Sequence, residues 1–498
     1  MGRVWLNNTS QERRFSWADS QSGIGKAFSG KDFPQKLCHG SCKPYGSARR
    51  RKAHSKLDRL SALILEWNMS PLILENIGAA ASLWMVLPFV LLLLLIALAP
   101  LWIPQLWEKY HAHTAIALGL ITACYYVFVL RRGDSVVHAA REYFSFISLV
   151  GSLYVVSGGI LIRIKGEATP GVNTLYLFLG ALLANFLGTT GASMLLIRPW
   201  IRMNKYRVTS LHVVFFIFLV SNVGGALTPI ADPPLFLGFL KGVPFWWALE
   251  NCWKPWLLTV GVILCVFYGL DFLNFRRAPL GVREDKVHDE VWQVDGLWNL
   301  LLVFGVVCSV WLPFGWRELA MVSAAVVSWY ATPKRVHEAN HFDFAPVKEV
   351  AWLFVGIFLT MQPALEILGA SADSLGLHSP MQFFWSTGAL SGVLDNAPTY
   401  LAFLAAGFGV AGLNLDTDMG QFLPQQTQLL RAISLGAVFF GAMTYLGNGP
   451  NLMVKKIAEQ QRVHTPSFMA YVLRFSLPVL VPVFALVGLL CFSKWRVF

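Results

Sequence analysis

The residues with the clearest chemical potential lie in the middle of an apolar stretch, 210–240. Within it, residues 221–234 read Ser-Asn-Val-Gly-Gly-Ala-Leu-Thr-Pro-Ile-Ala-Asp-Pro-Pro. These glycines and prolines and the aspartate cannot continue a helix through lipid. A helix broken inside a membrane exposes half-helix N-termini, which attract anions, and unwound carbonyls, which coordinate cations. The run therefore predicts a broken membrane helix that forms part of an ion or substrate site.

Three other apolar stretches are interrupted in a similar way. The interruptions are Met-Thr-Tyr-Leu-Gly-Asn-Gly-Pro-Asn at 443–451 within 431–454, Gly-Thr-Thr-Gly-Ala-Ser at 188–193 within 173–200, and Asp-Asn-Ala-Pro-Thr at 395–399 within 380–410. The last two are interpreted as turns of re-entrant hairpins, because a turn inside the membrane must be buried in protein. Two breaks in each half, in matching order, indicate one shared site.

Two aspartates lie within these breaks. Asp395 is an ionisable carboxyl group in an apolar segment, which is costly unless it is paired or protonated. We expect burial to favour its protonated form, so that Asp395 exchanges a proton for a cation near neutral pH. Asp232 precedes Pro233 and fits a helix N-cap with proline at the first helical position. Capping and binding are compatible roles for this residue.

Amide and hydroxyl side chains surround both aspartates. Their oxygens are hard ligands of the kind that suits an alkali cation, although they also cap helices and satisfy backbone groups. The candidate proton- and cation-binding residues are Asp395, Asn396, Asp232, Ser221, Asn222, Thr228, Thr189, Thr190, Thr399, Asn448 and Asn451. We expect transported Na⁺ and H⁺ at these residues, and neither a structural metal nor another cofactor.

One competing motif points to an enzyme. His337-Glu-Ala-Asn-His341 matches H-E-x-x-H, in which two histidines on one helical face bind zinc and the glutamate acts as the base. It would make the protein an intramembrane metalloprotease. The motif lies in a polar loop between Pro333 and Pro346, so we interpret it as a chance match and expect no enzyme activity.

The surrounding sequence consists of apolar stretches that meet or approach the ~20 residues of a membrane span. These stretches are 84–103, 113–130, 143–162, 210–240, 254–273, 293–314, 317–331, 350–369, 431–454 and 467–492. Together with the two hairpins they predict an all-α polytopic membrane protein. Each half has five spans, an odd number, so the second half must be inverted relative to the first, as in many secondary transporters.

The distribution of basic residues predicts the orientation. The loops expected on one side hold 17 Lys and Arg, against 9 on the other, so the first side should be cytoplasmic. This rule puts the start of the first span outside, which conflicts with the Arg49-Arg50-Arg51-Lys52 cluster upstream. A disordered tail, a natural start at Met69 or Met85, or a miscounted span would each resolve the conflict, and we favour the downstream start.

Composition argues strongly against a soluble protein. Of the 498 residues 55% are hydrophobic and 14% charged, whereas a soluble chain is about 25% charged. The net charge of +12 is concentrated in residues 1–83, which carry +7 of it, and nucleic-acid binding is not implied. The predicted organisation is a basic tail (1–83), a first repeat (84–273), a cytoplasmic linker (274–292), a second repeat (293–492) and a short C-terminal tail (493–498).

The motifs at 221–234, 395–398 and 447–451 resemble the signature segments of the ion-transporter superfamily, over roughly residues 84–492. Within it the chain is most similar to sodium/proton antiporters and to citrate transporters. The resemblance implies two inverted repeats around a central site that works by alternating access. At the first hairpin turn many relatives have Asp-Asn where this chain has Gly188-Thr189-Thr190, and arsenite permeases have Asn at the position of Leu235.

These features favour a sodium (cation)/proton antiporter in the inner cell membrane. The four breaks contain no Arg or Lys, so they suit a cation better than an organic anion, which is commonly held by a guanidinium group. The alternative is cation-coupled transport of a carboxylate such as citrate, with help from Lys455. The expected partners are membrane lipid, a small ion or small-molecule substrate, and a second copy of the chain in a homodimer.

Overall fold

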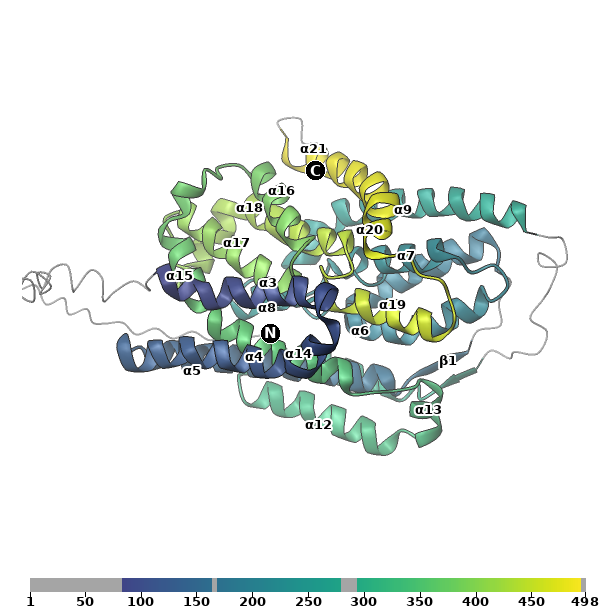
Figure 1. Cartoon of the computed structure of the whole chain (residues 1–498), viewed down its shortest axis with the longest axis horizontal. Coiled ribbons are helices and arrows are strands. Elements are labelled where there is room, and N and C mark those ends of the chain that lie inside the picture. Colours follow the sequence, from purple (N-terminus) through teal and green to yellow (C-terminus); the bar gives the residue numbers. More distant parts are fainter. Residues whose placement is uncertain (1–82, 164–167, 279–292, 494–498) are drawn as a thin grey trace, which may run out of the picture. The chain divides into compact units, whose positions relative to one another are not determined.

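The computed structural model describes residues 83–163, 168–278 and 293–493 (Figure 1). The predictions for the basic tail, for most of the 274–292 linker and for the last five residues lie outside this part of the chain. The division into repeats and tails stays a prediction.

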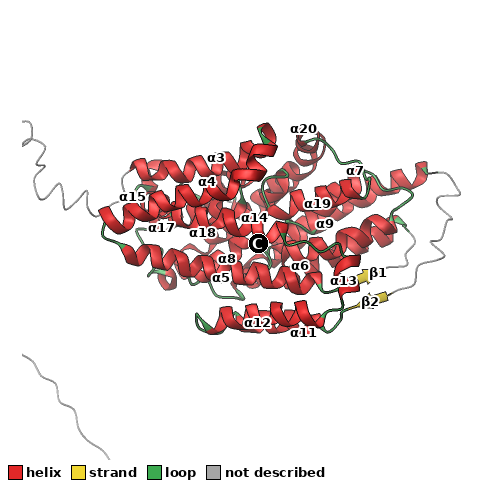
Figure 2. Ribbon diagram, turned by 60° about the horizontal axis from the view of Figure 1, so that its bottom comes forward, coloured by secondary structure: helices red, strands yellow, loops and turns green. Residues whose placement is uncertain are grey.

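The described chain is almost entirely helical (Figure 2). The first half contains α3 (Leu87–Trp102), α4 (Pro104–Cys124), α5 (Gly133–Gly158), α6 (Pro170–Met203), α7 (Ser210–Leu219), α8 (Pro233–Leu240) and α9 (Trp247–Arg277). The second contains α11 (Asn299–Ser309), α12 (Trp316–Ala331), α13 (Lys334–Ala339), α14 (Ala345–Thr360), α15 (Gln362–Ala370), α16 (Pro380–Ser391), α17 (Asn396–Val410), α18 (Met419–Phe440), α19 (Gly449–Gln460), α20 (Phe468–Tyr471) and α21 (Val481–Phe492). Six short helical segments accompany them: η1 (Leu83–Val86), η2 (Tyr125–Val129), η3 (Val223–Gly225), η4 (Ala372–Leu375), η5 (Gly441–Met443) and η6 (Val472–Leu480).

The two halves are joined by a small antiparallel sheet at the edge of the bundle (Figure 2). Strand β1 (Leu161–Arg163) pairs with β2 (Gln293–Asp295), and Ile162 is opposite Val294. The stretch 293–314 was expected to be a span from its first residue. That prediction was wrong, because its start forms β2 and a turn at Gly296, and the helix α11 covers only Asn299–Ser309.

By length and composition, five described helices could cross a membrane, and six if the bent pair α14 and α15 is one span, but one of the five is α6, which folds back on itself. This supports a multi-pass membrane protein. The ten predicted spans do not all correspond to long apolar helices, since some are short and two are broken. The inverted relation of the two halves stays a prediction.

Helix α6 is a hairpin of two helical segments that meet at Gly188. A straight helix of 34 residues would be about 50 Å long, yet Asn173 Nδ2 donates to Asn204 Oδ1 at 2.8 Å. The ring of Tyr176 also stacks on Trp200, with 5.2 Å between centroids. The chain reverses at Gly188, whose φ of +75° favours glycine. The hairpin predicted at 173–200 is present, with its turn where the sequence indicated.

The second predicted hairpin consists of α16 and α17. The two helices are joined by residues 392–395, and Phe383 of α16 contacts Phe403 of α17 with 6.3 Å between ring centroids. Both predicted helix breaks are also present. The first separates α7 from α8, and the second separates α18 from α19.

The helices that support the first hairpin come from both halves of the sequence. Helix α5 packs against α6, α12 and α14, and α14 also lies along α4 (Figure 1). The rings of Phe146 in α5 and Phe354 in α14 stack at 4.6 Å. This packing buries the apolar side of α5 and places it beside the tip of the first hairpin.

Candidate functional site

The four polar breaks meet at Asp232. Its Oδ1 accepts hydrogen bonds from Thr189 Oγ1 and Asn448 Nδ2, both at 3.0 Å. Its Oδ2 accepts one from Asn396 Nδ2 at 2.6 Å. Thr189 lies at the first hairpin turn, Asn396 at the second, and Asn448 at the second helix break. One carboxyl group therefore joins segments up to 216 residues apart in the sequence.

The Asp232 carboxyl group is enclosed and has no compensating charge in contact with it. The residue is 1% exposed, and no lysine, arginine or histidine of the described residues forms an ion pair with it. Asp395 is close enough to interact with it electrostatically. A buried carboxylate surrounded by neutral donors requires either a proton or a bound cation.

The two aspartates differ from the expected division of roles. Asp232 is at the N-cap position of α8, with proline following it, but its side chain makes no capping hydrogen bond. Asp395 is half-buried and does cap its helix, because its Oδ1 accepts from the Ala397 amide at 3.0 Å. The prediction that Asp232 is the N-cap of a helix that begins with proline is confirmed, although its side chain bonds to the site residues and does not cap the helix. The proton-exchange role of Asp395 stays a prediction, and the geometry favours Asp232 for that role.

Two unpaired acceptor oxygens lie near this carboxyl group. Asn222 Oδ1 and Asn396 Oδ1 are buried and have no hydrogen-bond donor among the described residues. Gly441 lies between these side chains. A Cβ at Gly441 would be 2.9 Å from Asn222 Oδ1 and 3.5 Å from Asn396 Nδ2, so the absence of a side chain lets the two asparagines approach each other. Oxygens of this kind are ligands for a hard cation.

A second set of hydrogen bonds joins the two helix breaks to each other. Asn222 Nδ2 donates to Asn451 Oδ1 at 2.8 Å, and Asn451 Nδ2 donates to the carbonyls of Gly441 and Thr444. Asn448 Nδ2 also donates to the Ser221 carbonyl at 3.1 Å. These bonds satisfy carbonyls that the helix breaks leave free, so Asn451 supports the site without contacting Asp232.

Three of the predicted hydroxyl residues point elsewhere. Thr228 Oγ1 donates to the Asn185 carbonyl at 2.6 Å, and Thr399 Oγ1 donates to the Asp395 carbonyl one turn earlier. Ser221 Oγ shares a hydrogen bond with Ser193 Oγ at 2.8 Å. Thr190 lines a small cavity beside Asp232. Of the predicted hydroxyl groups, only that of Thr189 contacts the carboxylate.

Asn185 was not identified from the sequence, although it attaches the first hairpin to the first helix break. Its Nδ2 donates to the Gly224 carbonyl at 2.7 Å, and its Oδ1 accepts from the Leu227 amide at 3.0 Å. The Thr189 amide donates to the Ala231 carbonyl at 2.7 Å. An amide side chain inside the apolar stretch 173–200 was the available signal, and it lies three residues before the turn.

A cavity of about 30 Å³ adjoins Asp232. Its walls are the first hairpin turn, residues 229–233 and the face of α5 that includes Leu149 and Leu153. A space of this size holds a water molecule or a single ion. It is too small for a tricarboxylate in the conformation described.

A larger cavity of about 870 Å³ lies at the other end of α8. Its lining includes four carboxylates (Asp134, Glu366, Asp416, Asp418) and two permanent cations (Arg132, Lys241). Lys241 follows α8 directly, and its Nζ contacts Glu142 Oε1 at 2.8 Å and Asp416 Oδ1 at 2.9 Å. The excess of carboxylates favours the entry of cations over anions.

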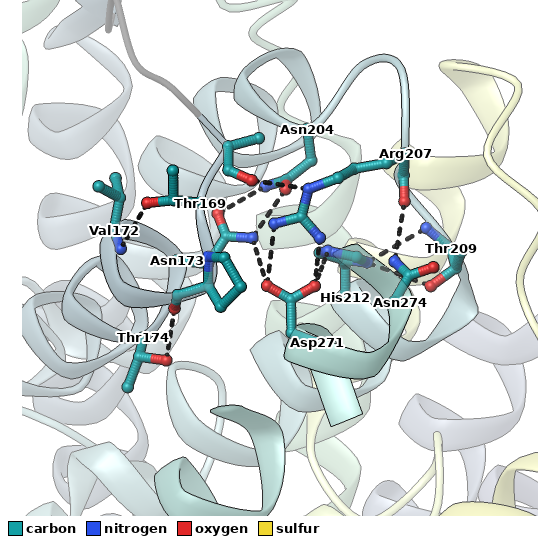
Figure 3. Close-up of polar contacts among 12 residues, drawn as sticks. Thr169, Val172, Asn173, Thr174, Asn204, Arg207, Thr209, His212, Asp271 and Asn274 are labelled. Carbon is teal, nitrogen blue, oxygen red and sulfur yellow. Dashed lines mark hydrogen bonds and ion pairs between the residues drawn. The ribbon is translucent and has the colours of Figure 1, made fainter. Parts of the chain in front are cut away.

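A buried charged cluster closes the base of the first hairpin (Figure 3). Asp271 of α9 accepts two hydrogen bonds from the Arg207 guanidinium and one from Asn173 Nδ2, and it lies 3.1 Å from His212 Nε2. Asn173 and Asn204 exchange amide hydrogen bonds across the two ends of α6. The cluster thus joins α6, α7 and α9. No sequence pattern predicted this cluster, because its partners are far apart along the chain.

The H-E-x-x-H motif does not form a zinc site among the described residues. His337 lies in α13 and its ring packs 4.6 Å from that of Trp329, where burial lowers its pKa. His341 lies beyond the end of α13 with a φ of +44°, so the two histidines do not share a helical face. No three His, Cys, Asp or Glu side chains of the described residues lie close enough together to hold a metal ion.

Replacing Glu338 by Ala should therefore leave transport and stability unchanged, because this glutamate is exposed. His337→Ala should lower stability by about 1–3 kcal/mol through lost packing against Trp329. Thermal unfolding and uptake into proteoliposomes measure both effects. Loss of activity in Glu338→Ala, with normal folding, would instead support an enzymatic role for this glutamate.

Comparison with known proteins identifies the family. Residues 78–492 match the family described as "Putative citrate transport". Because the match covers most of the chain, the protein belongs to this family. No curated protein matches the chain significantly.

Proposed function

Because the chain belongs to a transport family, we propose that it is a secondary active transporter that exchanges a cation, Na⁺ first among the candidates, for protons across the inner cell membrane. Asp232 is the group that binds proton and cation in turn. The observation that carries this proposal is the enclosed Asp232 carboxyl group, which has three neutral donors and no ion-pair partner among the described residues.

The neighbouring residues supply what exchange requires. In the protonated state the carboxyl group is neutral, so it needs no compensating charge. In the cation-bound state the carboxylate and the unpaired oxygens of Asn222 and Asn396 provide hard ligands. The same group cannot hold a proton and a cation together, so their binding is coupled.

The two helix breaks support an arrangement in inverted repeats. Asp232 is the N-cap of α8 and Asn448 that of α19, each helix has proline in its first two positions, and neither side chain caps its own helix. Instead, these side chains bond to each other. This equivalence is expected where two repeats meet at a site that alternates between the two sides of the membrane.

The larger cavity provides a route to the site in this proposal. Helix α8 runs from Asp232 to Lys241, a distance of about 12 Å for its eight residues. The carboxylates around the cavity would raise the local concentration of cations. The same carboxylates would repel an anionic substrate.

Cation-coupled citrate transport is the second candidate. The family description favours this candidate. So does the meeting of three helix N-termini at the site: Asp232 is the N-cap of α8, Asn396 is the first residue of α17, and Asn448 is the N-cap of α19. Such N-termini stabilise negative charge. Lys455, expected to help hold the anion, instead pairs with Glu459 at 2.9 Å.

Reconstitution in vesicles with a pH-sensitive dye separates the candidates. Na⁺, Li⁺, K⁺ and citrate are added in turn to vesicles that carry a proton gradient. Dissipation of the gradient by an alkali cation alone supports antiport. A response that requires citrate, with no effect of any cation alone, would replace it by the second candidate.

A further inference from the structure

Arg431 of α18 is a buried cation. It is 6% exposed, and no carboxylate of the described residues forms an ion pair with it. Its Nε is fully enclosed and makes no hydrogen bond. A guanidinium group in this position is costly unless an anion compensates it.

A second unpaired donor lies on the same side of α18. Ser434 follows Arg431 by three residues, which places the two side chains next to each other on the helix. Ser434 Oγ is also buried, and among the described residues its neighbour is the Tyr400 hydroxyl, with which it forms no hydrogen bond of good geometry. Both side chains can donate hydrogen bonds, and no acceptor among the described residues satisfies Arg431 Nε.

The depth of Arg431 in the membrane indicates which kind of group accepts its hydrogen bonds. Ten residues of helix separate it from Gly441, where α18 reaches the central break, and this corresponds to about 15 Å. If the break lies at the middle of a hydrocarbon layer of about 30 Å, Arg431 lies at its boundary with the lipid headgroups. The sequence before Arg431 fits that boundary, because 421–428 contains four glutamines.

The neighbouring helices end or begin at the same level. Arg431 lies within electrostatic range of Cys252, near the start of α9, and of Cys491, near the end of α21. Trp253 of α9 is 46% exposed. Tryptophan is enriched where the hydrocarbon layer meets the headgroups.

We propose that Arg431 and Ser434 bind the phosphate group of an anionic phospholipid where α9, α18 and α21 approach one another. The guanidinium group offers paired N–H donors that match phosphate oxygens, and the serine hydroxyl adds a third donor. The lipid supplies the negative charge that the described residues do not. This inference rests on the membrane position of the broken helix and not on the identity of the transported ion.

The test compares lipid binding by purified wild type and Arg431→Gln in detergent, using phosphatidylglycerol, phosphatidylcholine and inorganic phosphate. Native mass spectrometry counts bound lipid, and thermal unfolding reports the stabilisation. Phosphatidylglycerol should bind and stabilise the wild type more than phosphatidylcholine does. Arg431→Gln should weaken its binding by about tenfold or more, since a charge-assisted hydrogen bond is lost.

Arg474→Gln is the matched control, because Arg474 is an exposed arginine in the last span. It should keep the wild-type response. If Arg431→Gln does not fold, Arg431→Lys keeps the charge without the paired donors and should show intermediate binding. Equal lipid binding by the wild type and the Arg431 variant would overturn the proposal, as would equal stabilisation by inorganic phosphate, which would indicate a site for a free anion. Neither readout depends on transport, so a failure here is distinct from a failure of cation/proton exchange.

Discussion

Replacing Asp232 by Asn should stop cation/proton exchange while the protein still folds and inserts. The substitution keeps the size of the side chain and one acceptor oxygen for Thr189 and Asn448, but it removes both the charge and the titratable proton. We expect the exchange rate to fall by at least about a hundredfold, as when a group that transfers a proton is removed. Proton flux in vesicles, normalised to inserted protein, measures the loss.

The matched variant is Asp395→Asn. Asn caps a helix nearly as well as Asp, so it should preserve the hydrogen bond to the Ala397 amide and most of the exchange rate. Asp232→Glu should keep weak activity with an altered pH profile, because the carboxyl group moves by one methylene. Normal exchange in Asp232→Asn together with loss of exchange in Asp395→Asn would reverse the assignment and make Asp395 the proton carrier.

Asp271→Ala should cause the largest loss of stability. It would leave the Arg207 guanidinium buried and unpaired, since Asp271 accepts two of its hydrogen bonds. Removing one partner of a buried ion pair typically costs about 3–5 kcal/mol. The base of the first hairpin would also lose a hydrogen bond to α9. Thermal unfolding in detergent, followed by the fluorescence of the buried tryptophans, measures the change.

The exposed pair Arg132–Glu366 provides the control. Its side chains are 44% and 32% exposed and 3.2 Å apart, and such a pair contributes only about 0–1 kcal/mol. Glu366→Ala should therefore barely change the unfolding temperature. Equal losses in Asp271→Ala and Glu366→Ala would mean that the buried cluster does not hold the hairpin base.

The sequence was sufficient to locate the breaks. Glycine and proline at 221–234 and 443–451 exclude continuous helix, and Gly188 lies at the turn of the first hairpin. These features depend on the local backbone, which residue type controls directly. The same reasoning failed for 293–314, where hydrophobicity alone does not distinguish the strand β2 from the start of a helix.

The roles of individual side chains could not be derived in this way. Asp232 and Asp395 both precede a helix, and only their neighbours in space determine that Asp395 caps while Asp232 points to Thr189, Asn396 and Asn448. The pairing of Arg207 with Asp271 spans 64 residues. Such contacts depend on how distant helices pack, and no local pattern records them.

The most direct test of the central claim is the number of protons released when a cation binds. Titration calorimetry of the purified protein with Na⁺, Li⁺ and K⁺, in two buffers with different ionisation enthalpies, gives this number without transport or a membrane. If Asp232 exchanges a proton for a cation, the wild type releases about one proton per cation bound near neutral pH. The Asp232→Asn variant releases none. Cation binding by the wild type without proton release, or unchanged release in Asp232→Asn, would contradict the account.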